Sequence, residues 1–214
     1  MSASHHPSEA VLTAYACGSL ADGPGLTVAA HLEGCVHCRG LVGTMEAVGG
    51  ALMAELEPSA MHAQALDLAL ARIERPAEPR RVASAPVKTL EGWRLPAALQ
   101  GRKIGPRLWI APGLWFAHVH SNAPDGWRTY LLRAGKGQSL PEHGHRGLEV
   151  TAVLHGAFGD GIGQYGAGDF CEAAEELQHQ PEVVGDQACL CLISAKGGMR
   201  AKGIAGLLQP LLRV

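Results

Sequence analysis

The chain has 214 residues, 47% of them apolar, which is enough for one large domain or two ordinary ones with a sizeable core. Its formal net charge of −2 gives no hint of a DNA-binding surface, and no stretch approaches the roughly 18 apolar residues of a membrane span. The charge is uneven, because residues 1–76 contain eight acidic and three basic residues, whereas the remainder contains 12 and 15. An acidic unit is repelled by nucleic acid and attracted to basic proteins. We therefore expect no nucleic-acid partner and no membrane partner.

The N-terminal stretch MSASHHPSEA has neither the basic region nor the apolar region of a signal peptide. We therefore expect a cytoplasmic protein. In that reducing compartment clustered cysteines are more often metal ligands or redox switches than structural disulfides. The chain has six cysteines, and no structural disulfide is expected among them.

The first 75 residues are rich in Ala, Leu, Met and Glu, which favour helix. Ser8 can cap a helix over roughly 8–18, and Gly23-Pro24-Gly25 predicts a turn. Further helical segments are expected from about 25 to 33 and, beyond Gly34, to about 55. Residues 60–74 predict an amphipathic helix. Its apolar face is formed by Ala63, Leu66, Leu70 and Ile73.

The strongest local pattern in this half is His31-x3-Cys35-x2-Cys38. These residues share one face of a helix, or they lie across a tight helix–turn–helix. Two thiolates and an imidazole suit tetrahedral zinc, which needs a fourth ligand. His6, on or just before the first helix, can supply it and so join two helices.

Two nearby histidines and an alternative role for the cysteines have to be considered beside this zinc site. His37 lies between the cysteines and is expected to point away, and His5 adjoins His6, so that periodicity separates the two poorly. The alternative for Cys35 and Cys38 is a thiol redox switch that forms a disulfide under peroxide.

The sequence RPAEPRRVASAPVK (75–88) predicts an extended linker. Beyond it, short strands separated by Gly and Pro predict a sandwich or barrel. The candidate strands are 114–120, 128–134, 148–156 and 188–194.

In this second half, Gly137-x5-His143-x-His145-x3-Glu149-x6-Gly156 matches the first cupin motif at every fixed position. His143 and His145 are two residues apart, so in a strand they point to the same side. Glu149 is expected to return to the same metal. Three further cysteines, Cys171, Cys189 and Cys191, are interpreted as packed in the core, with oxidation beside the metal as the alternative.

The segment HHPSEAVLTAYACGSL followed by HLEGCVHC resembles the zinc-binding anti-sigma domain, and its fusion to a cupin resembles the ChrR type of anti-sigma factor. The resemblance implies an α+β chain with a four-helix zinc-binding domain (1–75) and an antiparallel all-β cupin (93–200). A Pro-rich linker (76–92) would join them, and a C-terminal tail (201–214) would follow. The resemblance also implies His179 as the fourth cupin ligand and zinc at both sites.

For function, the resemblance implies a non-enzyme that binds a group IV (extracytoplasmic-function) sigma factor in a one-to-one complex. The helix at 60–74 would dock between the two domains of the sigma factor. The cupin would release the factor under oxidative stress, with singlet oxygen as the implied signal. The alternative is a metal-dependent cupin dioxygenase whose helical domain serves only oligomerisation.

Overall fold

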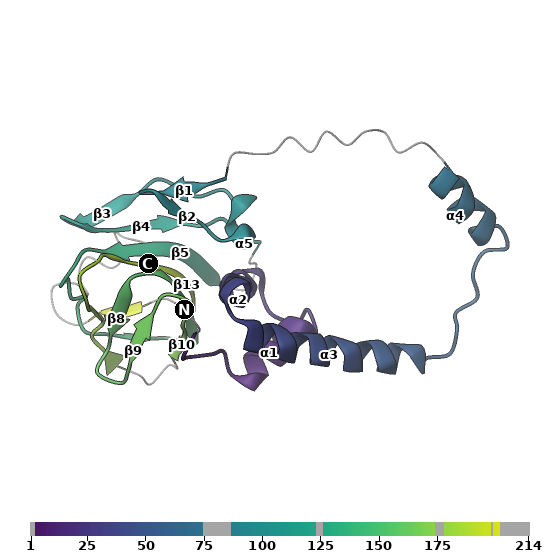
Figure 1. Cartoon of the computed structure of the whole chain (residues 1–214), viewed down its shortest axis with the longest axis horizontal. Helices are drawn as coiled ribbons and strands as arrows, with labels where there is room; N and C mark the ends of the chain where they lie inside the picture. Colours follow the sequence, from purple (N-terminus) through teal and green to yellow (C-terminus); the bar gives the residue numbers. More distant parts are fainter. Residues whose placement is uncertain (1–2, 75–86, 123–125, 174–177, 198, 202–214) are drawn as a thin grey trace.

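The computed structural model describes residues 3–74, 87–122, 126–173, 178–197 and 199–201. Four helices precede the strands, as predicted, and a short fifth helix follows the second strand (Figure 1). The helices are α1 (Glu9–Ala16), α2 (Asp22–Gly34), α3 (Val36–Ala54), α4 (Ala65–Glu74) and α5 (Ala97–Gln100).

The start of α2 differs from the prediction. Gly23, Pro24 and Gly25 form the first turn of the helix instead of a turn before it. Proline is tolerated there, because the first backbone N–H groups of a helix have no intrahelical acceptor for proline to disrupt. Ser8 caps α1 as predicted, its side chain accepting from the backbone N–H of Val11.

The second half is built from antiparallel strands in four sheets. The largest has the order β10-β7-β13-β5-β4-β3, and three-stranded sheets β11-β6-β14 and β12-β8-β9 and the hairpin β1-β2 complete the unit. The strands of the large sheet are β3 (Leu108–Ala111), β4 (Leu114–His118), β5 (Trp127–Ala134), β7 (Glu149–His155), β10 (Phe170–Ala173) and β13 (Cys189–Lys196). The other strands are β1 (Thr89–Leu90), β2 (Trp93–Arg94), β6 (His143–His145), β8 (Ala157–Gly159), β9 (Gln164–Gly166), β11 (Gln178–His179), β12 (Glu182–Val183) and β14 (Met199–Ala201). The four strands predicted from the sequence therefore correspond to β4, β5, β7 and β13.

Alternate residues of the large sheet face two different cores, as the period of a strand requires. Along β13, Cys191 and Ile193 pack in the interior cluster with Phe116 and Tyr130. Leu190 and Leu192 lie on the opposite face, in a second cluster. The interior of the cupin is thus lined by one face of the sheet, and the other face is available for helices.

Helix α2 covers part of that outer face (Figure 1). Thr27 and Val28 are fully buried, and the Thr27 hydroxyl lies 2.9 Å from the hydroxyl of Ser194 on β13. At the start of the same helix, Asp22 forms a bidentate ion pair with Arg102, with both N–O distances at 2.7 Å. The helical unit and the cupin therefore share one continuous buried interface.

The structure shortens the predicted linker. β1 lies inside the range 76–92 and pairs with β2 across a turn in which Gly92 has a φ of 84°, a conformation that glycine adopts without strain. Residues 75–86 lie outside the described part of the chain. Ala201, assigned to the predicted tail, ends β14 and pairs with His143, and residues 202–214 also lie outside it.

Helix α4 contains no buried residue and lies apart from the other helices and the cupin (Figure 1). It begins five residues later than predicted, but Leu66, Leu70 and Ile73 lie within it and are all strongly exposed. Its apolar stripe is therefore not used for packing within the described chain.

Candidate metal centres

Four side chains from three segments converge at the junction of α2 and α3. The ligand atoms of His6, His31, Cys35 and Cys38 all lie within 4.8 Å of one another. The Nε2 atom of His31 is 3.3 Å from the sulfur of Cys38, and Nδ1 of His6 is 3.4 Å from the sulfur of each cysteine. All but His6 are buried.

The local chain explains this convergence. His31 lies in the last turn of α2, Cys35 separates α2 from α3 with an extended backbone, and Cys38 lies in the first turn of α3. The Cys35 sulfur accepts from the backbone N–H of Cys38, at the positive end of the α3 dipole. A helix N-terminus stabilises a thiolate. Of the two geometries compatible with the sequence, the structure therefore contains the helix–turn–helix.

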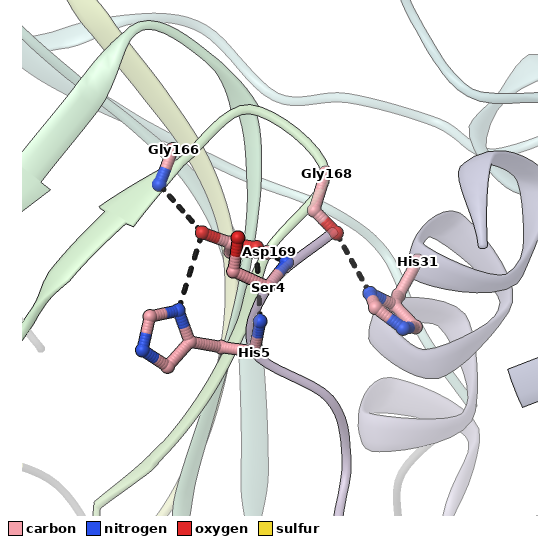
Figure 2. A network of polar contacts seen from close by, with 6 residues as sticks. All are labelled: Ser4, His5, His31, Gly166, Gly168 and Asp169. Carbon is pink, nitrogen blue, oxygen red and sulfur yellow. Dashed lines mark hydrogen bonds and ion pairs between the residues drawn. The ribbon is translucent and has the colours of Figure 1, made fainter. Parts of the chain in front are cut away.

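The hydrogen bond of His31 fixes which of its nitrogens can bind a metal. Its Nδ1 lies 2.8 Å from the carbonyl oxygen of Gly168, which can only accept, so Nδ1 carries the proton (Figure 2). Nε2 is then left with its lone pair toward Cys38. Burial lowers the pKa of His31, an effect only partly opposed by this hydrogen bond, and favours the neutral ring that metals require.

The donor set and its spacing fit zinc. With zinc–sulfur bonds of about 2.3 Å and zinc–nitrogen bonds of about 2.0–2.1 Å, tetrahedral ligands lie about 3.5 Å apart. The measured separations of 3.3–3.4 Å between sulfur and nitrogen are close to this value. Burial, followed by the neighbouring Cys35, raises the pKa of Cys38 to about 12 in the metal-free protein, so metal binding must release that proton.

The neighbouring histidines take other positions. His5 turns to the carboxylate of Asp169, 3.3 Å from its Nδ1, and is not part of the cluster (Figure 2). His37 is exposed and is also outside it. The direction of the backbone after Ser4 thus separates His5 from His6, which spacing along the sequence could not do.

Of the four cupin residues, the structure brings His143 and His179 into direct contact. His143 begins β6 and His179 ends β11, and these two residues are paired across the strands. Their Nε2 atoms are 3.2 Å apart. Glu149 begins β7, is buried, and is hydrogen-bonded to Tyr130. His145 ends β6, and its side chain lies outside the described part of the structure.

Hydrogen bonds orient both described histidines. Nδ1 of His143 lies 2.8 Å from the carbonyl of Pro141, and Nδ1 of His179 lies 3.2 Å from the carboxylate of Asp160. With Nδ1 as the donor in each ring, the ring nitrogen that could bind a cation is Nε2, and the two Nε2 atoms are the ones that lie close together. Burial raises the pKa of Glu149 to about 8 in the metal-free protein, although the Tyr130 hydrogen bond opposes the effect, and a cation there would favour its charged form.

Sequence reasoning missed the residues that orient these ligands: Asp160, Tyr130 and Gly168. Asp160 also accepts from the backbone N–H groups of Ile162 and Gly163, at 3.0 and 3.1 Å, in a tight turn. An Asp-Gly pair marks such a turn in the sequence. Nothing local indicates that its carboxylate meets a histidine 19 residues away.

The cysteines of the cupin are buried in the core, as expected. Cys171, Cys189 and Cys191 all belong to the interior cluster, and the sulfurs of Cys189 and Cys191 are 3.6 Å apart. The pKa of Cys191 is well above its ordinary value because of the neighbouring Cys189 thiol and burial. Such thiols are weak nucleophiles, although they share the interior with Glu149.

The chain is similar to known proteins over its whole length. Residues 106–197 match the ChrR cupin-like domain family. The anti-sigma-E factor ChrR of Cereibacter sphaeroides is 38% identical over the full length of both chains. The crystal structure of Rhodobacter sphaeroides SigE in complex with the anti-sigma ChrR matches with a TM-score of 0.76 and 36% identity, over 91% of this chain and all of that one. An RmlC-like cupin from Ralstonia eutropha matches with 14% identity and a TM-score of 0.42, over 61% and 87% of the two chains.

The fold and the cysteine–histidine cluster define a helical Cys/His domain packed on a cupin. The chain belongs to the ChrR family of anti-sigma factors, because the similarity extends over its whole length. Within the described residues, no helix is both long enough and apolar enough to cross a membrane.

Proposed function

We propose that this protein is a cytoplasmic anti-sigma factor and not an enzyme. Its helical unit binds one extracytoplasmic-function sigma factor and blocks it, and its cupin releases the factor under oxidative stress, with singlet oxygen as the signal. The observation that carries the proposal is α4, whose leucines and isoleucine are exposed although they form an apolar stripe. A helix of this kind suits the helix-in-groove mode of recognition.

Charge supports the same partner. Residues 1–76 contain eight acidic residues and only three basic ones, which favours a basic partner such as a DNA-binding factor. Because the chain belongs to the ChrR family of anti-sigma factors, we take this basic partner to be a sigma factor. The proposed domains are a helical domain (1–75), a linker, a cupin and a C-terminal tail. The linker expected over 76–92 ends before β1, so the cupin begins with that strand instead of at residue 93, and it extends through Ala201, the first residue of the expected tail.

The test of this function is a transcription assay with the sigma factor encoded beside the gene. We expect the full chain to form a one-to-one complex and to block transcription. The double variant Leu70→Asp/Ile73→Asp should lose at least about tenfold in affinity, because two charges would have to be desolvated in the groove. Its melting temperature should be unchanged, since α4 contains no buried residue.

The matched control is Leu114→Ala, in β4, because Leu114 is buried in the interior cluster of the cupin. That variant should lose stability and keep its affinity for the sigma factor. If the α4 variant binds as tightly as the wild type, α4 is not the docking element and the proposal in this form is wrong.

We also propose that each domain holds one zinc ion. His6, His31, Cys35 and Cys38 would hold the first, and His143, His145, Glu149 and His179 the second. Bound zinc supplies a structural cross-link and no redox chemistry. The support for the second site is the facing pair of Nε2 atoms in His143 and His179.

Metal analysis of the purified chain tests the two-zinc proposal. We expect about two zinc ions per wild-type chain and about one in His179→Ala, because three remaining ligands hold zinc far more weakly. Asp160→Asn should weaken the second site by about 10- to 100-fold, since it changes the partner that orients His179. Stoichiometric iron in the cupin, with metal-dependent oxygen consumption, would favour the dioxygenase instead.

A further inference from the structure

The segment that carries His6 lies against the cupin. The Oδ1 atom of Asp169, in the turn between β9 and β10, accepts from the backbone N–H groups of Ser4 at 2.6 Å and His5 at 3.1 Å (Figure 2). The backbone N–H of Phe170 donates to the carbonyl of His5 at 3.1 Å. These three bonds determine the path of the chain directly before His6.

A second acidic residue, in β10 itself, contacts the chain just after His6. Glu172 accepts from the backbone N–H of Ser8 at 2.6 Å and from its hydroxyl at 3.1 Å. Ser8 is also the N-cap of α1. His6, the exposed member of the cluster, is thus held on both sides by β10 and the turn before it.

The same stretch of the cupin also orients a second ligand. The carbonyl of Gly168 accepts from Nδ1 of His31, as described above, and Figure 2 shows it beside the Asp169 network. Asp169 is itself held by the backbone N–H of Gly166, 2.8 Å from its Oδ2. One turn of the cupin therefore contacts His31 directly and also contacts the chain just before His6.

Strand β10 connects this turn to the interior of the cupin. Phe170 faces outward into the core of the helical unit, whereas Cys171 faces inward into the interior cluster. Ala173, at the end of the strand, is paired with Glu149 of β7. A displacement of β10 caused by a change at the cupin site would reach the turn through this single short strand.

We propose that residues 168–172 of the cupin position His6 and His31, and thereby set how tightly the N-terminal cluster holds its metal. This inference rests on the proposed zinc site. Asp169 and Glu172 are positioning residues for His6, and the carbonyl of Gly168 is the positioning group for His31. The cupin would then control the sigma-binding unit by loosening its metal.

The experiment uses the full chain loaded with Co²⁺ in place of zinc. Cobalt bound by thiolates has a near-ultraviolet charge-transfer absorption, and only the N-terminal cluster contains thiolates in its proposed ligand set. We would measure how fast a chelator removes this signal from the wild type and from Asp169→Ala, Asp169→Asn and Glu172→Ala. Asp169→Ala should lose the metal about 10- to 100-fold faster, as expected for a group that orients a ligand.

The other variants separate positioning from general damage. Asp169→Asn keeps an oxygen that can accept from Ser4 and His5, so it should restore much of the slow release. Glu172→Ala removes the two hydrogen bonds to Ser8, which follows His6 by two residues, and should give a smaller increase. Arg102→Ala removes the bidentate ion pair to Asp22, which joins α2 to the cupin away from the cluster, and should release metal within about twofold of the wild type.

Three outcomes decide the matter. Faster release in Asp169→Ala and Glu172→Ala, but not in Arg102→Ala, supports the inference. Equal release in all variants, or equal acceleration in Arg102→Ala, overturns it, because the contact would then matter only as general docking. If the wild type shows no thiolate absorption, the proposed zinc site itself is wrong, and the inference is overturned with it.

Discussion

The Cys38→Ser variant is expected to lose the metal of the N-terminal cluster and, with it, the ability to inhibit the sigma factor. Cys38 is fully buried, and its sulfur lies within 3.4 Å of ligand nitrogens from both His6 and His31. A serine hydroxyl does not ionise near neutral pH and leaves three ligands. We expect metal affinity at this site to fall by at least about 100-fold, since the ligand must bind as an anion.

The measurement is zinc per chain together with inhibition in the transcription assay. About one zinc should remain, held by the cupin. Cys17→Ser is the matched control, because Cys17 is exposed and outside the cluster, and it should keep about two zinc ions and full inhibition. If the Cys38→Ser protein still inhibits the sigma factor, the zinc at this site is not needed for sigma binding. Peroxide-driven zinc release with a Cys35–Cys38 disulfide would favour the thiol switch.

Replacing Gly23 by alanine is expected to destabilise the interface between α2 and the cupin. A Cβ atom there would lie 2.4 Å from the hydroxyl oxygen of Thr129 and 3.3 Å from that of Ser194. These hydroxyls are buried and 3.0 Å apart, so neither can move without breaking their hydrogen bond. We expect the free energy of unfolding to fall by about 1–3 kcal/mol, as for other overpacked cores.

Gly25→Ala, two residues further along the same helix, is the matched control. Apart from its own helix backbone, no heavy atom of the described residues lies within 4 Å of its added Cβ. The intrinsic preference of alanine for helix should therefore stabilise the protein by up to about 1 kcal/mol. Urea unfolding of the full chain, followed by tryptophan fluorescence, compares the two. Equal stability in both variants would mean that α2 does not pack on the sheet as described.

The same interface bears on how separable the two units are. A fragment that ends before the cupin would expose Thr27 and Val28, which are fully buried in the whole chain. It would also remove the carbonyl of Gly168 from His31. The helical unit should therefore be less stable, and hold its metal less tightly, when it is separated from the cupin.

The order of the helices, four of the strands and the convergence of His31, Cys35 and Cys38 could be predicted from the sequence. The physical reason is that helices and strands have fixed periods, so spacing along the chain determines which side chains share a face. His31, Cys35 and Cys38 lie within eight residues of one another, and His143 and Glu149 within seven. The directions of these side chains are therefore set by the local helix or strand geometry, which the sequence pattern indicates. The cupin ligand set stays a prediction, and its member His179 came from the family resemblance.

Only the tertiary structure decided what orients those ligands. His31 meets Gly168 and Ser4 meets Asp169 across more than 130 residues of sequence. The choice of His6 over His5 and the packing of α2 on β13 likewise depend on contacts between segments that are distant in the sequence. Such contacts form because two folded surfaces are complementary in shape and hydrogen bonding, and no periodicity within either segment indicates its partner.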